Sequence, residues 1–277
     1  MRSRPVPPWN QRRCRAAYVV PVEESQRGAL PAGIEVGNEA EAARAVREMF
    51  ARVAPRYDLL NHLLSGQIDR FWRRRLVHSV RPYLQRDTVN IVDCCCGTGD
   101  LALALARERA RLRPDKAPVC LASDFCRPML VRAADKFGRA GLPPVLAEAD
   151  ATRMPLSDSS VDLVTIAFGF RNLANYRDGA EEFRRLLAPG GCLAVLEFSQ
   201  PTSKLWGALF NFYFKHVLPR LGNAISGSGG AYSYLQDSVQ RFPPPEEVRE
   251  LLLGVGFQRV KVQMLSGGVS VLYLAYV

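Results

Sequence analysis

At 277 residues, the chain has room for one large domain or two small ones. Its composition, 48% hydrophobic and 23% charged, is typical of a globular protein, and no apolar run approaches the roughly 18 residues that cross a bilayer. These numbers exclude a transmembrane helix, while the formal charge of +10 admits an anionic membrane surface or nucleic acid as a partner.

The first 40 residues are rich in proline and arginine and show no sustained periodicity. Two carboxylates, Glu23 and Glu24, are unusual for a transit peptide. We interpret residues 1–40 as a disordered tail.

Helical periodicity begins after this tail. Residues 41–54 predict a helix that Pro55 ends, and a second helical zone covers 57–83. Six arginines and no carboxylate lie between positions 70 and 86, namely Arg70, Arg73, Arg74, Arg75, Arg81 and Arg86. Such a stripe fits a solvated face, a membrane surface or, less well, nucleic acid.

Strands and helices then alternate. Strands are predicted at 89–94, 118–123, 144–149, 161–168 and 191–198, and helices at 100–111, 127–137 and 177–187. Strands separated by helices of this length indicate βαβ units and a parallel sheet.

The end of the chain breaks this pattern. A helix at 245–254 precedes two strands, 257–265 and 269–277, and a short glycine-containing loop joins these strands. The loop predicts a hairpin, so the last strand runs antiparallel. The expected fold is α/β: a Rossmann-like, mostly parallel seven-stranded sheet ending in an antiparallel hairpin, as in class I methyltransferases.

We therefore expect one domain over 41–277 with an insertion at 200–243, which is too long for an ordinary connection. The insertion is rich in aromatic residues and predicts a lid or a wall for a substrate. A plain packing helix is the alternative for residues 205–217.

The turn after the first strand carries the first cofactor signal. Gly97, Thr98 and Gly99 allow a ligand to approach the backbone closely, but the same string also fits a dinucleotide fingerprint. Asp93, just before the loop, would repel a pyrophosphate and suits the amino group and sulfonium of S-adenosylmethionine. The sequence therefore favours S-adenosylmethionine as cofactor.

Acidic residues also follow the second and third strands. Asp124 is placed to accept hydrogen bonds from ribose hydroxyls, and the alternative is an N-cap of the next helix. Asp150 and Ala151 are placed to read the adenine edge, and a simple turn acid is the alternative.

Seven cysteines are present, three of them contiguous at 94–96. Neighbouring strand residues point to opposite faces, so this triplet cannot close a metal site by itself. With no CxxC pair, we expect no metal and a reducing, cytoplasmic setting.

Residues 47–277 resemble the ubiquinone/menaquinone biosynthesis C-methyltransferases of the UbiE/MenG type. The resemblance rests on Tyr57–Ser65 with Asp69–Trp72, on Phe168–Leu173, on Arg184–Gly191 and on Tyr234–Ser238. It implies methylation of a ring carbon of a prenylated quinol, with cofactor contacts at Thr98, Asp124 and Asp150-Ala151. Three departures stand out: Cys95 in the glycine loop, Ala167 where some members have a serine, and Asp69 where histidine is common.

The resemblance also directs the choice of catalytic candidates. A quinol carbon becomes nucleophilic once its neighbouring hydroxyl ionises, and a phenol with a pKa near ~10 needs help at neutral pH. We expect Arg171 to stabilise the phenolate and Tyr57, Asp58 or Asn61 to orient the hydroxyl. The alternatives are a structural salt bridge for Arg171 and a helix start with a packed ring for Tyr57 and Asp58.

The substrate expected is demethylmenaquinol, because the Cys-Cys-Gly-Thr loop and Tyr213-Phe214 look more like that branch of the family. The benzoquinol of the ubiquinone pathway, or another small molecule or lipid, remains the alternative. We expect peripheral contact with the inner face of the membrane, no nucleic acid partner, and leave a homodimer open. A nucleic acid methyltransferase and a cofactor-binding module without turnover are the more distant alternatives.

Overall fold

The computed structural model describes residues 39–58, 67–117, 120–201 and 230–277. The strands are β1 (Ile91–Cys94), β2 (Leu121–Asp124), β3 (Val145–Glu148), β4 (Val161–Ala167), β5 (Leu187–Phe198), β6 (Arg259–Leu265) and β7 (Ser270–Tyr276). The helices are α1 (Glu39–Val53), α3 (Ile68–Ser79), α4 (Arg81–Leu84), α5 (Asp100–Leu112), α6 (Arg127–Arg139), α7 (Tyr176–Leu186), α10 (Gly230–Arg241) and α11 (Pro245–Gly254). Short 3-10 turns are η2 (Ala54–Arg56), η3 (Phe170–Asn172) and η5 (Ser266–Gly268).

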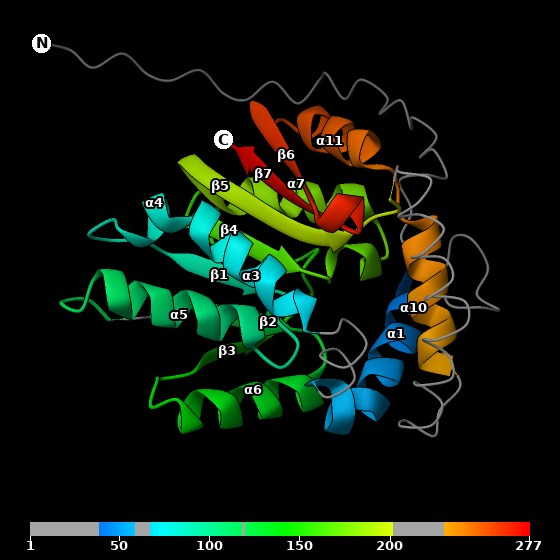
Figure 1. Cartoon of the computed structure of the whole chain (residues 1–277), viewed down its shortest axis with the longest axis horizontal. Coiled ribbons are helices and arrows are strands. Elements are labelled where there is room, and N and C mark those ends of the chain that lie inside the picture. The colour runs from blue at the N-terminus through cyan, green and yellow to red at the C-terminus, as the bar shows by residue number, and fades with distance from the viewer. Residues whose placement is uncertain (1–38, 59–66, 118–119, 202–229) are drawn as a thin grey trace, which may run out of the picture.

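All seven strands form one sheet in the order β3-β2-β1-β4-β5-β7-β6 (Figure 1). Strands β1 to β5 pair in parallel, and β7 runs antiparallel to both β5 and β6. The predicted parallel sheet with its antiparallel end is confirmed. The strand order reverses at β1, which places a ligand crevice at the carboxyl ends of β1, β2 and β4.

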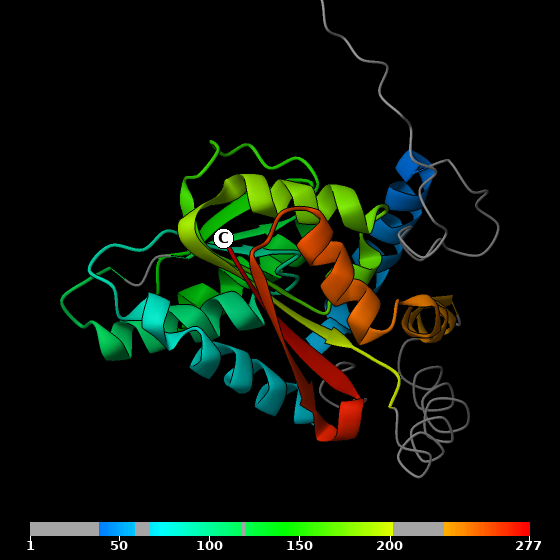
Figure 2. The ribbon, with the colours of Figure 1, turned by 90° about the horizontal axis from the view of Figure 1, so that it is seen from above.

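Neighbouring residues of a strand point to opposite sides of the sheet, and in the central strands β1, β4, β5 and β7 residues on both sides are buried. Ile91 and Leu163 pack under α3, α4 and α5, whereas Val92 and Val164 pack under α7 and α11. The view from above shows the two helical layers with the sheet between them (Figure 2). This double burial explains why the strands are almost continuously apolar.

The predicted helical zone 57–83 is divided in the structure. Helix α3 ends at Ser79 and α4 begins at Arg81, with Pro82 in its first turn. A proline removes a backbone donor and clashes with the preceding turn, so one continuous helix cannot pass this point.

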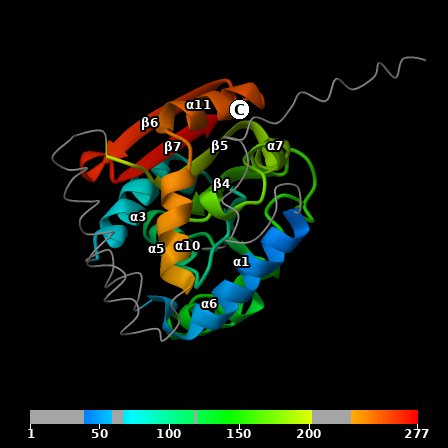
Figure 3. The same cartoon turned by 90° about the vertical axis from the view of Figure 1, so that its right-hand side faces the viewer.

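Helix α10 belongs to the predicted insertion 200–243 but was not itself predicted. It lies beside α1 (Figure 3), and its residue Tyr234 is buried. Residues 202–229, which include the proposed packing helix, lie outside the described residues, as do residues 1–38 of the predicted tail. Among the described helices, none is long and apolar enough to cross a membrane.

Candidate active site

A cavity lies at the carboxyl ends of β1, β2, β3 and β4, with α1 as part of its wall. Its lining from the sheet edge consists of Asp93, Cys95–Thr98, Asp124, Phe125, Ala149–Thr152 and Ala167–Gly169. Six predicted cofactor residues therefore line one cavity, as the parallel strand order requires: Asp93, Gly97, Thr98, Asp124, Asp150 and Ala151. Ala43, Phe50 and Tyr57 close the cavity from the N-terminal side.

The turn after β1 has a left-handed backbone at three positions, with φ of +49° at Cys95, +55° at Gly97 and +83° at Gly99. Gly97 lines the cavity, and a Cβ on it would come within 3.7 Å of the Tyr57 ring. Gly99 does not line the cavity. A Cβ there would lie 3.0 Å from the Ala133 Cβ, so this glycine serves the close packing of α5 on α6.

Asp93 is 1% exposed and lines the cavity. One carboxylate oxygen, Oδ1, accepts a hydrogen bond of 2.7 Å from the Thr165 hydroxyl, while Oδ2 is buried without a hydrogen-bond partner. Burial raises the pKa of this carboxyl group to about 7. An unpartnered buried oxygen beside a glycine loop fits the amino group of S-adenosylmethionine, which would satisfy it.

Asp124 also lines the cavity, and the alternative that it is the N-cap of α6 is wrong, because the N-cap residue is Cys126. Its Oδ2 accepts 2.8 Å from the backbone N–H of Gly97, and its Oδ1 accepts 2.8 Å from that of Cys126, the N-cap residue of α6. Burial raises its pKa to about 6. Each oxygen keeps a further lone pair with which to accept a ribose hydroxyl.

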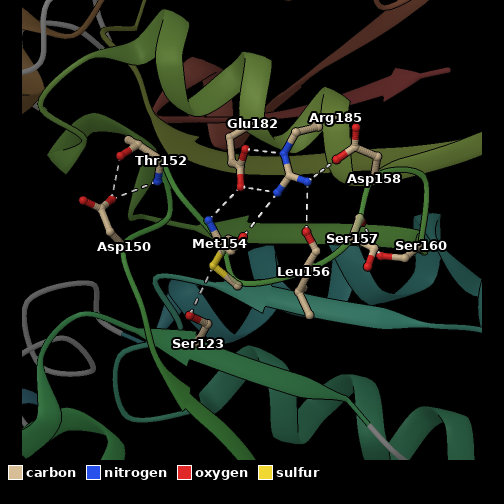
Figure 4. Close-up of polar contacts among 10 residues, drawn as sticks. All are labelled: Ser123, Asp150, Thr152, Met154, Leu156, Ser157, Asp158, Ser160, Glu182 and Arg185. Atoms are coloured by element: carbon tan, nitrogen blue, oxygen red, sulfur yellow. Dashed lines mark hydrogen bonds and ion pairs between the residues drawn. The ribbon is translucent and has the colours of Figure 1, made fainter.

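Asp150 and Ala151 lie at the rim, where a loop leaves β3. Asp150 Oδ1 accepts from the backbone N–H and the hydroxyl of Thr152, at 2.9 and 2.8 Å. The next residues are tied to α7 (Figure 4): Glu182 accepts 2.7 Å from the Met154 N–H, and Arg185 donates to the carbonyls of Met154 and Leu156 at 3.2 and 2.9 Å. Arg185 belongs to the motif Arg184–Gly191, but no role was predicted for its side chain.

The predicted orienting residues have different surroundings. Tyr57 lines the cavity, whereas Asn61 lies outside the described residues. Asp58 accepts 2.5 Å from the Thr98 hydroxyl and pairs with Lys136 at 2.8 Å. Lys136 also donates 2.9 Å to the Thr98 oxygen, so Asp58 is bound to the glycine loop.

Arg171 is buried and does not line the cavity. Its guanidinium donates hydrogen bonds of 2.6 Å to Glu197 and 2.6 Å to the Phe168 carbonyl. This is the structural salt bridge that the sequence left open as the alternative role of Arg171. Its neighbour Asn172 does line the cavity and accepts 3.1 Å from the Tyr234 hydroxyl. Direct contact between Arg171 and a ring would require this ion pair to open.

Arg73 and Asn172 line the cavity but were not predicted as site residues. Arg73 lines the cavity from α3, although the sequence marked it only as one arginine of the stripe. Its neighbours Arg74 and Arg75 are exposed on the same helix. Helical spacing alone could have separated Arg73 from them, because it shares a face with the buried Asp69 and Leu76.

The described residues contain no group of three histidine, cysteine or acidic side chains that could hold a metal. The sheet, with its antiparallel last strand, and the cavity at the ends of its parallel strands define the fold class. The fold is that of class I methyltransferases, which use S-adenosylmethionine.

The family follows from the sequence model of the ubiE/COQ5 methyltransferase family, which matches residues 37–277. The chain belongs to this family. A demethylmenaquinone methyltransferase from Deinococcus radiodurans is 45% identical over 235 residues, covering 85% of this chain and 93% of the relative. The enzyme of that name from Thermus thermophilus is 45% identical over 226 residues, covering 82% and 98%.

A ubiquinone/menaquinone biosynthesis C-methyltransferase from Syntrophotalea carbinolica is 41% identical over 227 residues, covering 82% of this chain and 92% of the relative. Among solved structures, the [4+2]-cyclase SpnF has a TM-score of 0.58 at 19% identity, covering 88% and 79%. An S-adenosylmethionine-dependent methyltransferase from Thermotoga maritima has a TM-score of 0.55 at 18% identity, covering 83% and 99%. These two likenesses show the fold, which hosts more than one chemistry.

Proposed function

We propose that this enzyme methylates a ring carbon of a prenylated quinol, converting demethylmenaquinol to menaquinol. The observation that carries the proposal is a cavity lined by both acidic and apolar side chains. Asp93 and Asp124 supply carboxylates for the cofactor, and Phe50, Phe168 and Leu173 supply apolar surface. A flat, apolar ring fits beside the methyl donor there, and relatives named for demethylmenaquinone support this choice.

When bound, S-adenosylmethionine supplies an electrophilic methyl group, so the chain mainly has to align a ring carbon with it. We assign the amino group of the cofactor to Asp93, the ribose to Asp124 and the adenine edge to Asp150 and Ala151. Gly97 and Thr98 supply the turn against which the cofactor lies.

Tyr57 and Asn172 line the cavity, and we propose that they hold the quinol hydroxyl and support its ionisation. Arg171 acts on this step by positioning Asn172 through the Glu197 ion pair, instead of contacting the ring. Asp58 orients Thr98, and Asn61 stays a candidate from the sequence alone.

A methyl-transfer assay with isotopically labelled donor tests the substrate. We expect label in reduced demethylmenaquinone and none in its oxidised form, because only the quinol can ionise to a phenolate. The reduced benzoquinol of the ubiquinone pathway is the second candidate, since relatives such as that from Syntrophotalea carbinolica are named for both pathways. Failure to label either quinol by folded, cofactor-binding enzyme would refute the proposal.

We also propose that the enzyme works in the cytoplasm, at the inner face of the membrane that dissolves its substrate. Ile68 and Phe71 on α3 and Met264 on β6 are exposed apolar side chains, with exposed fractions of 46%, 54% and 45%. Helix α3 meets the turn η5, which follows β6, where the Trp72 indole donates a hydrogen bond of 2.9 Å to the Ser266 hydroxyl. Exposed arginines of α3 surround this apolar edge and suit anionic headgroups.

Flotation with anionic liposomes tests this surface. Phe71→Ser should reduce the bound fraction, whereas Val131→Ser should leave it unchanged, because Val131 is equally exposed but lies on α6. Equal flotation of both variants would contradict the proposed surface. Light scattering on the same protein tests the homodimer, which a mass of one chain would exclude.

A further inference from the structure

Arg73 is the one cationic side chain among the described residues that line the cavity. It is held in place: its Nη1 donates to Asp69, and its Nη2 lies 3.7 Å from the Asp100 carboxylate. Its guanidinium carbon lies 5.7 Å from the centre of the Phe168 ring. The side chain is only 12% exposed, so its charge faces the cavity and its acidic neighbours.

The cavity therefore has an acid and a cation near the same turn. Asp93 presents a buried oxygen without a hydrogen-bond partner, and the charge of Arg73 is close enough to lower the pKa of this carboxyl group. An α-amino acid carries one ammonium and one carboxylate on a single carbon. Opposite charges that line the same cavity match that pair.

We propose that Arg73 binds the carboxylate of the methionine part of S-adenosylmethionine, while Asp93 binds its ammonium group. A guanidinium has five donors in a planar fork, and the contacts of Arg73 with Asp69 and Asp100 leave donors for a third carboxylate. Asp69 then has a positioning role. It is 3% exposed and orients the Arg73 fork from one turn away on α3.

The other nearby cation does not suit this task. Lys136 does not line the cavity, and its ammonium already contacts three oxygens, those of Thr98, Asp100 and Asp58, at 2.9, 2.5 and 2.8 Å. A rival task for Arg73 itself is to stabilise the quinol phenolate, because Phe168 lies beside it. The two tasks differ in which ligand loses affinity when Arg73 is removed.

The inference rests on cofactor binding and not on the identity of the quinol, so calorimetry tests it without turnover. S-adenosylhomocysteine carries the whole amino acid, its decarboxylated analogue keeps only the ammonium, and methylthioadenosine lacks both groups. Loss of a charged hydrogen bond should lower affinity by about 10- to 100-fold. Wild-type enzyme should therefore bind S-adenosylhomocysteine more tightly than the decarboxylated analogue by that factor.

Arg73→Ala should lose affinity for S-adenosylhomocysteine and keep its affinity for the other two ligands. Asp93→Asn should instead lower the affinity for both ligands that carry the ammonium, S-adenosylhomocysteine and its decarboxylated analogue. Arg74→Ala is the matched control, because Arg74 is exposed on the same helix, and all its affinities should stay unchanged.

Three outcomes would overturn the inference. The first is equal affinity of wild-type enzyme for S-adenosylhomocysteine and its decarboxylated analogue, which needs no variant to fold. The second is an equal loss of affinity for all three ligands in folded Arg73→Ala. The third is unchanged binding with slower turnover, which would assign Arg73 to the phenolate. Failure of the quinol assay with this binding pattern intact would refute only the proposed substrate.

Discussion

Burial raises the pKa of Asp93, near the end of β1, and in the proposed site this shift would couple cofactor binding to pH. Asp93 has a pKa of about 7 in the ligand-free protein, above its usual 3.8, because its carboxylate is desolvated. Since the folded pKa is raised, ionisation of this group lowers the free energy of unfolding as pH rises from about 4 through 7. An ammonium group bound beside Asp93 would have the opposite effect and lower this pKa, because it stabilises the ionised carboxylate.

Affinity for S-adenosylhomocysteine should therefore fall by about tenfold from pH 8 to pH 6, since most Asp93 is protonated at pH 6. Calorimetry in buffers of different ionisation heat should detect proton release on binding at pH 6 and little at pH 8. Asp93→Asn should abolish the part of this release that comes from Asp93. Equal affinity at both pH values would contradict the role of this group.

Glu197 forms a buried ion pair with Arg171, and removal of its charge would leave the guanidinium without a counter-charge. It is fully buried and accepts from the guanidinium and the backbone N–H of Arg171 at 2.6 and 3.1 Å. Glu197→Gln should lower the free energy of unfolding by about 3 kcal/mol, because a buried guanidinium would lose its counter-charge. Urea denaturation measures this.

Glu246→Gln is the matched control for that measurement. Glu246 pairs with Arg249 on the surface, where an ion pair contributes less than about 1 kcal/mol. If Glu197→Gln lowers the free energy of unfolding no more than this control does, the ion pair with Arg171 does not determine stability.

At the scale of elements, helix α7 holds the loop that carries Asp150 and Ala151, the residues proposed to read the adenine edge. Arg185 and Glu182 together bind the backbone of Met154 and Leu156, shortly after Ala151 (Figure 4). The sequence predicted both the helix and the loop. It did not predict their connection, because nothing local relates residues about thirty positions apart.

Arg185→Ala should weaken binding of S-adenosylhomocysteine by about fivefold, since hydrogen bonds worth about 1 kcal/mol no longer fix the loop. Calorimetry measures the change. Arg184→Ala is the control, because its side chain donates to the Gly256 carbonyl, away from the cavity. Equal losses in the two variants would argue against a specific role for the Arg185 contacts.

Among elements, the strands were predicted best and α10 was missed. Most of the parallel strands are apolar runs that are followed by a helix, a pattern whose period is local and easy to detect. Helix α10 begins at the last residue of a glycine and serine run at 226–230, which locally favours a turn. Its stability comes from tertiary contacts with α1 and η3, and these contacts have no local signal.

For the whole molecule, the charge of +10 adds a salt dependence to the proposed membrane contact. Liposome binding should require anionic lipid and should fall as salt is raised from 0.05 to 0.5 M, as the Debye length shrinks to a few ångströms. Flotation at both salt concentrations measures this. Salt-independent binding to neutral vesicles would point to apolar insertion alone.

The sequence by itself determined the order of strands and helices, the antiparallel end and the acids that follow β1, β2 and β3. These features depend on local periodicity, and the parallel topology then brings the carboxyl ends of the strands together. Tertiary structure alone decided which groups of distant segments meet. Arg171 pairs with Glu197 of β5 and does not line the cavity, whereas Arg73 lines it together with Asp93 of β1 and Ala167 of β4. These neighbours lie far apart in the chain, so no local pattern predicts them.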